Sequence, residues 1–137
     1  MIKVHIHTIG RSKENWLNEA LQEYEKRLQG RIQIKWQIAS GDEELIQQTA
    51  LEPYLIALDI QGSLLSSEAL SQKLTKAGSR YSFVIGGADG LNQQILHQAK
   101  WRWSLSPLTF THQMTRLILL EQLYRAYEID RKSPYHK

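Results

Sequence analysis

The chain has 137 residues, of which 42% are hydrophobic and 23% charged, and its 17 basic and 14 acidic side chains leave a formal net charge of +3. These values are typical of a single soluble globular domain, here residues 1–137, and they exclude a disordered tail. No apolar run approaches the ~20 residues of a membrane span, so we expect no membrane partner. The absence of cysteine excludes disulfides and thiolate chemistry and fits a cytoplasmic location.

Hydrophobic periodicity switches repeatedly between the two-residue repeat of strands and the 3.6-residue repeat of helices. In chain order we expect a strand over 2–9, a helix over 13–29, a strand over 31–39, a helix over 42–51, a strand over 54–60, a helix over 66–77, a strand over 81–85, a helix ending at 98, a strand over 101–105 and a helix over 111–129. Ser12 is expected to cap the first helix and Gly30 to end it. The alternation predicts an α/β fold with a mainly parallel sheet and helices on both faces.

Two loops follow the fourth and fifth predicted strands, at the sheet edge where α/β proteins bind ligands. The first, Gly86-Gly87-Ala88-Asp89-Gly90, is neither a Walker loop nor a dinucleotide fingerprint, so a tight turn and a cofactor loop are equally good interpretations. The second, residues 105–110, is either a plain connector or a binding loop that offers backbone groups to a flat aromatic ligand such as adenine. Asp59, at the end of another predicted strand, lies beside the same edge.

His5 and His7 share one face of the first predicted strand and superficially resemble a metal-binding pair. The sequence shows no third ligand beside them. Solvated or hydrogen-bonded histidines are therefore the favoured interpretation, and we expect no metal.

The last predicted helix carries apolar side chains around most of its circumference, as in a helix that is buried on several sides. In a domain this small, a twofold dimer with this helix in the interface would bury it. His112 and Arg116 share one face of the helix, which is a weak functional signal because surface helices often carry such pairs. The tail residues Tyr135 and His136 combine an aromatic ring with a titratable group, although a frayed terminus is the simpler interpretation.

Short motifs run along nearly the whole chain. They are Ile6-His7-Thr8-Ile9-Gly10, Glu23-Tyr24-Glu25-Lys26-Arg27-Leu28, Leu58-Asp59-Ile60-Gln61-Gly62, Leu65-Ser66-Ser67-Glu68, Phe83-Val84-Ile85-Gly86-Gly87-Ala88-Asp89-Gly90-Leu91, Ser104-Leu105-Ser106-Pro107-Leu108-Thr109-Phe110, His112-Gln113-Met114, Glu121-Gln122-Leu123-Tyr124-Arg125-Ala126 and Pro134-Tyr135-His136-Lys137. Each is weak alone. In this order and spacing they resemble the bacterial ribosomal large-subunit pseudouridine methyltransferase H family, which belongs to the SPOUT class with its α/β knot.

The resemblance implies a homodimeric enzyme that transfers a methyl group from S-adenosylmethionine to N3 of a pseudouridine in helix 69 of 23S rRNA, on assembled ribosomes. It also implies a C-terminal trefoil knot. The residues expected to contact the methyl donor are Leu58, Gly86, Leu105, Ser106, Pro107, Leu108, Thr109 and Phe110. The residues expected to act on the target base are His136 as proton acceptor or orienting group, Tyr135 as stacking or hydrogen-bonding group, and Arg116 and Arg125 as phosphate or oxyanion partners.

Two features depart from the family pattern. Thr111 stands where the family usually has proline, which suggests a less rigid helix start, and residues 38–53 form a segment shorter than is typical. We expect a trimmed helix in that segment and no loss of activity. The alternative functions are a catalytically inactive RNA- or ribosome-binding protein with the same fold and a related enzyme that modifies tRNA.

Overall fold

The computed structural model describes residues 1–87 and 89–136, in which strands and helices alternate as predicted. The elements are β1 Ile2–Ile9, α1 Asn15–Leu28, β2 Ile32–Ala39, α2 Asp42–Thr49, β3 Leu55–Leu64, α3 Ser67–Ala77, β4 Arg80–Val84, α4 Gln93–Gln98, β5 Trp101–Ser104 and α5 His112–Asp130. The motif residues Ala88 and Lys137 lie outside the described residues.

The strands form one sheet in the order β2-β1-β4-β3-β5, and every neighbouring pair is parallel. This confirms the predicted α/β class. The main difference concerns β3, which runs four residues beyond its predicted end at Ile60. Its pairing with β5 shifts register between Leu58 and Ser63, and the last part of the strand is mostly exposed. The exposed part has no apolar pattern, which explains why periodicity missed it.

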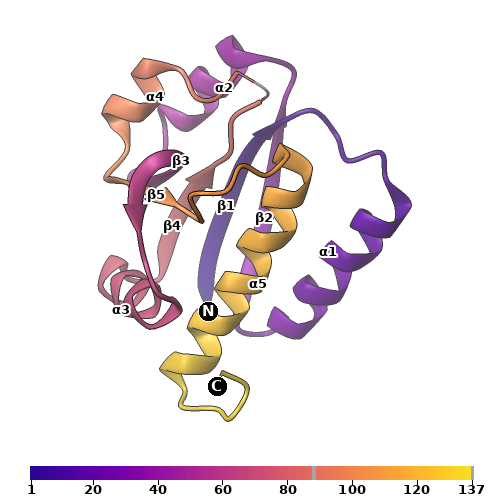
Figure 1. Ribbon diagram of the computed structural model, residues 1–137, viewed down its shortest axis with the longest axis vertical. Helices are drawn as coiled ribbons and strands as arrows, with labels where there is room; N and C mark the ends of the chain where they lie inside the picture. The colour runs from indigo at the N-terminus through magenta and orange to yellow at the C-terminus, as the bar shows by residue number, and fades with distance from the viewer. Residues whose placement is uncertain (88, 137) are drawn as a thin grey trace.

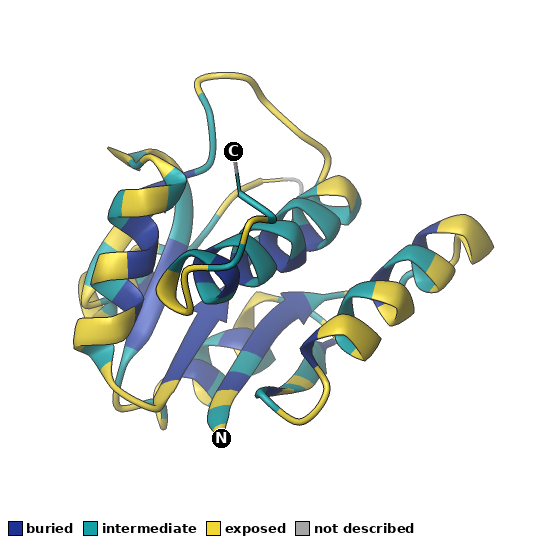
Figure 2. Ribbon diagram, turned by 90° about the horizontal axis from the view of Figure 1, so that it is seen from below, coloured by how far each residue is buried: buried dark blue, intermediate teal, exposed yellow. Residues whose placement is uncertain are grey.

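Helices cover both faces of the sheet, also as predicted (Figure 1). On one face α1, α3 and α5 pack on the larger apolar cluster, which contains Val4, Phe83 and Leu119. On the other face α2 and α4 pack on a smaller cluster that contains Leu45 and Ile95. Figure 2 shows the buried residues concentrated on the strands and on the helix sides that face them.

The predictions for the helix ends are confirmed at some positions and wrong at another. Ser12 does not cap α1, which begins after Glu14 without a side-chain cap, so that prediction is wrong. Gly30 has φ +84, the left-handed conformation expected just beyond a helix. Thr111 caps α5 by accepting a hydrogen bond from the Met114 N–H at 3.2 Å. Thr111 therefore fixes the helix start through its side chain.

The helix α5 is the most embedded in the fold, since it packs between α1 and α3 (Figure 1). Its own residues Leu119, Leu120 and Leu123 are buried, whereas its Met114 remains 37% exposed. No helix in the described part of the chain is both long and apolar enough to cross a membrane. The trefoil knot and the single-domain organisation stay predictions.

Candidate active site

A cleft of about 640 Å³ opens at the carboxyl ends of β3, β4 and β5, and we call it the main cleft. Its lining residues come from the middle of β3, from the loop after β4, from the end of β5 with the loop that follows it, and from the start of α5: Leu58, Asp59, Ile60, Ile85, Gly86, Gly87, Gly90, Leu91, Trp103, Ser104, Leu105, Ser106, Leu108, Thr109, Phe110, Thr111, His112 and Thr115. Both loops singled out in the sequence meet here. The volume lies in the range of small-molecule sites, about 300–1,000 Å³.

The glycine loop shapes one wall of the main cleft through close backbone packing. A Cβ on Gly86 would lie 2.7 Å from the backbone of Gly90, whereas one on Gly87 would meet only a side-chain atom of Ile9 at 3.7 Å. Gly90 itself has φ +81, which favours glycine. The loop is therefore a tight turn, and it also lines the cleft, so the two interpretations do not exclude each other.

The loop of residues 105–110 forms another part of the wall and is held by short-range hydrogen bonds. The Ser104 hydroxyl donates to the Ser106 carbonyl at 3.0 Å, and the Ser106 hydroxyl accepts from the Leu108 N–H at 3.0 Å. Leu108 is 70% exposed and Phe110 36% exposed, which is unusual for large apolar side chains. Of the predicted donor contacts only Pro107 does not line the cleft. This part of the wall thus combines a backbone held by hydrogen bonds with apolar side chains that remain exposed in the single chain.

Arg116, a predicted catalytic residue, is buried and does not line the main cleft. One of its terminal nitrogens donates to the Thr8 hydroxyl at 3.3 Å and to the carbonyls of Ile9 and Gly10 at 3.0 and 2.6 Å. Burial lowers the pKa of its guanidinium from the ordinary value. No carboxylate pairs with it among the described residues. These contacts tie the first turn of α5 to the end of β1, which favours a positioning role.

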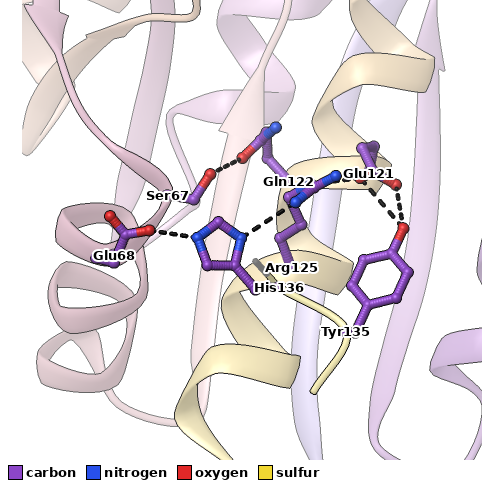
Figure 3. Close-up of polar contacts among 7 residues, drawn as sticks. All are labelled: Ser67, Glu68, Glu121, Gln122, Arg125, Tyr135 and His136. Atoms are coloured by element: carbon purple, nitrogen blue, oxygen red, sulfur yellow. Dashed lines mark hydrogen bonds and ion pairs between the residues drawn. The ribbon is translucent and has the colours of Figure 1, made fainter. Parts of the chain in front are cut away.

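The other three predicted catalytic residues meet on α5, together with two glutamates (Figure 3). This tail cluster consists of Glu68, Glu121, Arg125, Tyr135 and His136. Arg125 donates to Glu121 at 2.6 Å and to Nδ1 of His136 at 3.1 Å, while Nε2 of His136 contacts the Glu68 carboxylate. The Tyr135 hydroxyl donates to Glu121 at 3.3 Å. The tail therefore has defined partners and is not frayed.

The main cleft and the tail cluster are separate sites on one chain. Thr115 lines the cleft and Arg125 belongs to the tail cluster, and ten helical residues of ~1.5 Å rise place them about 15 Å apart along α5. No residue of the tail cluster lines the cleft. His136 as placed here consequently cannot act on a molecule bound in the cleft of its own chain.

Two members of the tail cluster were missed by sequence reasoning. Glu68 and Glu121 occur inside motifs that carried the resemblance, yet nothing in their spacing linked them to the tail. Glu68 begins α3 and Glu121 is central in α5, so only the packing of these two helices brings them beside His136 and Tyr135.

An open parallel sheet with a cleft beyond the carboxyl ends of its strands is the arrangement of ligand-binding α/β proteins. Residues 2–136 match a family model described as "Predicted SPOUT methyltransferase". A ribosomal RNA large subunit methyltransferase H from Protochlamydia amoebophila (strain UWE25) is 48% identical over 141 residues, covering 100% of both chains. The chain therefore belongs to the SPOUT methyltransferase family, in the group of the ribosomal RNA large subunit methyltransferase H proteins.

Two further comparisons concern the length of the family members and the fold of this chain. The protein of the same name from Legionella pneumophila (strain Paris) is 40% identical over 156 residues, again covering 100% of both chains. Family members thus differ in length, and the Protochlamydia relative shares the short form. A probable methylase family protein from Haemophilus influenzae Rd KW20 has a solved structure that superposes with TM-score 0.63 at 11% identity, covering 98% of this chain and 70% of that one. This likeness concerns the fold alone.

Proposed function

We propose that this chain methylates N3 of a pseudouridine in helix 69 of 23S rRNA, using S-adenosylmethionine as methyl donor. The observation that carries the proposal is the main cleft, which gathers seven of the eight predicted donor contacts from three separate segments of the chain. The names of the full-length relatives support an RNA of the large ribosomal subunit as the substrate.

The main cleft suits a nucleoside-containing donor. Leu58, Ile85 and Trp103 supply apolar surface for a flat ring, and the loop of residues 105–110 supplies backbone polar groups at its margin. S-Adenosylmethionine, when bound, supplies an electrophilic methyl group, so the chain has to hold donor and acceptor in line. Orientation of this kind accounts for a large share of catalysis in reactions between two bound substrates.

The acceptor side of the active site requires a second chain. Because the tail cluster lies about 15 Å along α5 from the cleft of its own chain, we assign it to the cleft of a twofold-related partner. The exposed apolar residues Leu108 and Phe110 of the cleft, together with the exposed Met114 near the start of α5, offer a surface for such a homodimer. Each dimer then has two active sites, and each site combines a cleft with the partner's tail.

The side chains of the tail cluster can position the base and remove its proton. The neutral imide nitrogen of the base is a poor nucleophile, and His136 accepts or directs the N3 proton while Tyr135 packs on or hydrogen-bonds the base. Arg125 stabilises charge on the neighbouring oxygen or binds phosphate. Here Arg125 occupies the lone pair of His136 Nδ1, so proton acceptance requires that contact to be released. Arg116 acts indirectly, by positioning the start of α5 against the end of β1.

The small net charge of +3 favours docking on a preformed ribosomal surface over binding to RNA by charge alone. We therefore expect the cytoplasmic ribosome to be the physical substrate. The test is mass spectrometry of helix 69 nucleosides from ribosomes incubated with and without the protein and donor. A new methylpseudouridine supports the proposal. Donor binding without ribosomal methylation contradicts it, and methylation of tRNA instead would identify the tRNA-modifying alternative.

Mixing two impaired variants, at a donor concentration too low to occupy the Gly86→Ala cleft, tests the shared active site. Gly86→Ala damages the cleft and His136→Ala damages the tail, and after subunit exchange half of the dimers contain one of each. Such a dimer has one intact site, assembled from the undamaged cleft and the undamaged tail, so the mixture should recover about a quarter of the wild-type activity. If cleft and tail of the same chain work together, the mixture stays no more active than the two separate variants.

A further inference from the structure

Three side chains that periodicity left unconnected meet on the sheet face covered by α2 and α4. His5 and His7 project from β1, and Glu52 follows the C-terminal end of α2. Nδ1 of His5 lies 3.3 Å from the Glu52 carboxylate, and Nε2 of His7 also lies 3.3 Å from it. The three possible ligand atoms all lie within 4.8 Å of one another. None of these residues lines the main cleft.

The three side chains are polar or ionisable, yet two of them are almost entirely buried. The side chain of His7 is fully buried, and within the described residues its Nδ1 has no partner, while its Nε2 lies 3.3 Å from the Glu52 carboxylate without the geometry of a hydrogen bond. The Glu52 side chain is only 7% exposed, and no lysine or arginine in the described part of the chain pairs with it. Buried polar groups in folded proteins are normally satisfied, and an unsatisfied one points to a bound water or ion.

The spacing and the chemistry of the three groups fit zinc. Ligands about 2.0–2.1 Å from a tetrahedral zinc ion stand about 3.3–3.4 Å apart, which matches the two distances to Glu52. Two imidazoles and one carboxylate form a known zinc donor set, whereas magnesium and calcium prefer oxygen ligands throughout.

We propose that His5, His7 and Glu52 form a zinc site that fastens the end of α2 to β1. Ser82, opposite His5 in the sheet, hydrogen-bonds the Glu52 carboxylate and orients it, as outer residues of metal sites commonly do. The His5 side chain is 22% exposed, which leaves a path for the ion and for a solvent ligand. The sequence-based expectation of no metal rested on a missing third ligand, and the fold supplies that ligand from 45 residues beyond His7. This site is independent of the proposed methyl transfer.

The test uses the full-length protein, freed of any histidine tag and treated with a chelator. Isothermal titration and elemental analysis should find one zinc ion per chain, and zinc should raise Tm where magnesium at the same concentration does not. Cobalt(II) in place of zinc should give the visible absorption of a four-coordinate ion. Donor binding in the main cleft should not change, because the two sites share no residue.

Matched variants separate this site from other histidines. His5→Gln and Glu52→Gln should each weaken zinc binding by more than about 100-fold, beyond the 10- to 100-fold cost of losing an outer partner. Neither should then show the rise in Tm with zinc. His97→Gln, at an exposed position on α4, should bind like the wild type. Absence of stoichiometric zinc in the wild type, or wild-type affinity in His5→Gln, would overturn the assignment.

Discussion

The main cleft and the tail cluster differ in how the fold builds them. The cleft is formed by strand ends and by tight loops held by backbone contacts, such as the close approach of Gly86 to Gly90. The tail cluster consists of polar side chains from α3, from α5 and from the tail that follows α5, held to one another by hydrogen bonds and ion pairs. A rigid pocket can bind a ligand as it stands, whereas surface side chains can exchange partners.

The helix α5 connects the two regions, since its first turn lines the main cleft and its second half carries Glu121 and Arg125. Changes along this helix therefore test whether the two regions work together. If they do, tail variants should affect transfer alone, cleft variants should affect donor binding, and variants that hold α5 in place should affect stability as well.

The largest expected effect is that of His136→Ala on methyl transfer. Removal of a group that handles a proton typically lowers a rate by about 10²–10⁴-fold. Donor affinity, measured by isothermal titration, should remain unchanged because His136 does not line the cleft. His97→Ala is the control, with wild-type activity expected. A parallel loss of donor affinity in His136→Ala would show that the tail acts in donor binding instead.

Arg116→Met should come next and should act on the protein as a whole. It removes the donor to the Thr8 hydroxyl and to the carbonyls of Ile9 and Gly10, and it leaves the buried Thr8 side chain without that partner, at a cost of about 1–3 kcal/mol in the free energy of unfolding. Donor affinity should fall with stability, because the first turn of α5 shifts. Arg116→Lys, which retains a cationic donor, should recover part of both. A variant with normal stability and donor affinity but a low kcat would instead support direct catalysis by Arg116.

Gly86→Ala should weaken donor binding by about 10- to 100-fold, which corresponds to the 1–3 kcal/mol that overpacking costs. The added Cβ lies 2.7 Å from the Gly90 backbone, which must move. The matched control is Gly87→Ala, also in the cleft wall, whose Cβ has room. Titration with S-adenosylhomocysteine would measure both affinities. Equal affinities in the two variants would show that the packing of the glycine loop does not affect donor binding.

Glu128→Gln should cost about 1–2 kcal/mol in unfolding free energy at pH 7, because a buried carboxylate loses its charge-assisted hydrogen bond from Arg131 at 2.9 Å. Burial alone raises the pKa of Glu128. Hydrogen bonds from Ser133 and Arg131, with the charges of Arg131 and Arg31, outweigh it and hold the pKa below the ordinary 4.5.

The sign of the pH dependence follows from that lowered pKa. The carboxylate stabilises the fold above pH 4.5, and this contribution is lost as the pH falls through the lower pKa of the folded state. Urea unfolding at several pH values should therefore show the wild type and Glu128→Gln converging in acid. The exposed Asp130→Asn should stay within about 0.5 kcal/mol of the wild type throughout.

The smallest expected effect concerns Thr111 at the mouth of the main cleft. Thr111→Ala removes a helix cap and should cost about 1 kcal/mol. Thr111→Pro also loses the cap, but φ of −62° already suits proline, which restricts the unfolded chain. Thermal unfolding should therefore rank Thr111→Pro above Thr111→Ala. The reverse order would indicate strain before the helix.

Sequence reasoning predicted the elements well because their signals are local. The alternation of Val4 and Ile6 with His5 and His7 correctly predicted β1, and Ser66, where the helix that follows β3 was predicted to begin, caps α3. The same reasoning failed at Ser12 because several polar residues precede α1 and only the chain's path selects where the helix begins. It also ended β3 too early, because the extension pairs with β5 across a shift in register.

By itself, the sequence determined the α/β class, the two loops of the main cleft and, through its motifs, the SPOUT methyltransferase family, since these depend on periodicity and on residue order. Only the tertiary structure decided which side chains meet across long separations. It placed Glu68 beside His136, buried Arg116 against the end of β1 and brought Glu52 to His5 and His7. Such contacts depend on how helices and strands pack, and packing leaves no local pattern from which they could be predicted.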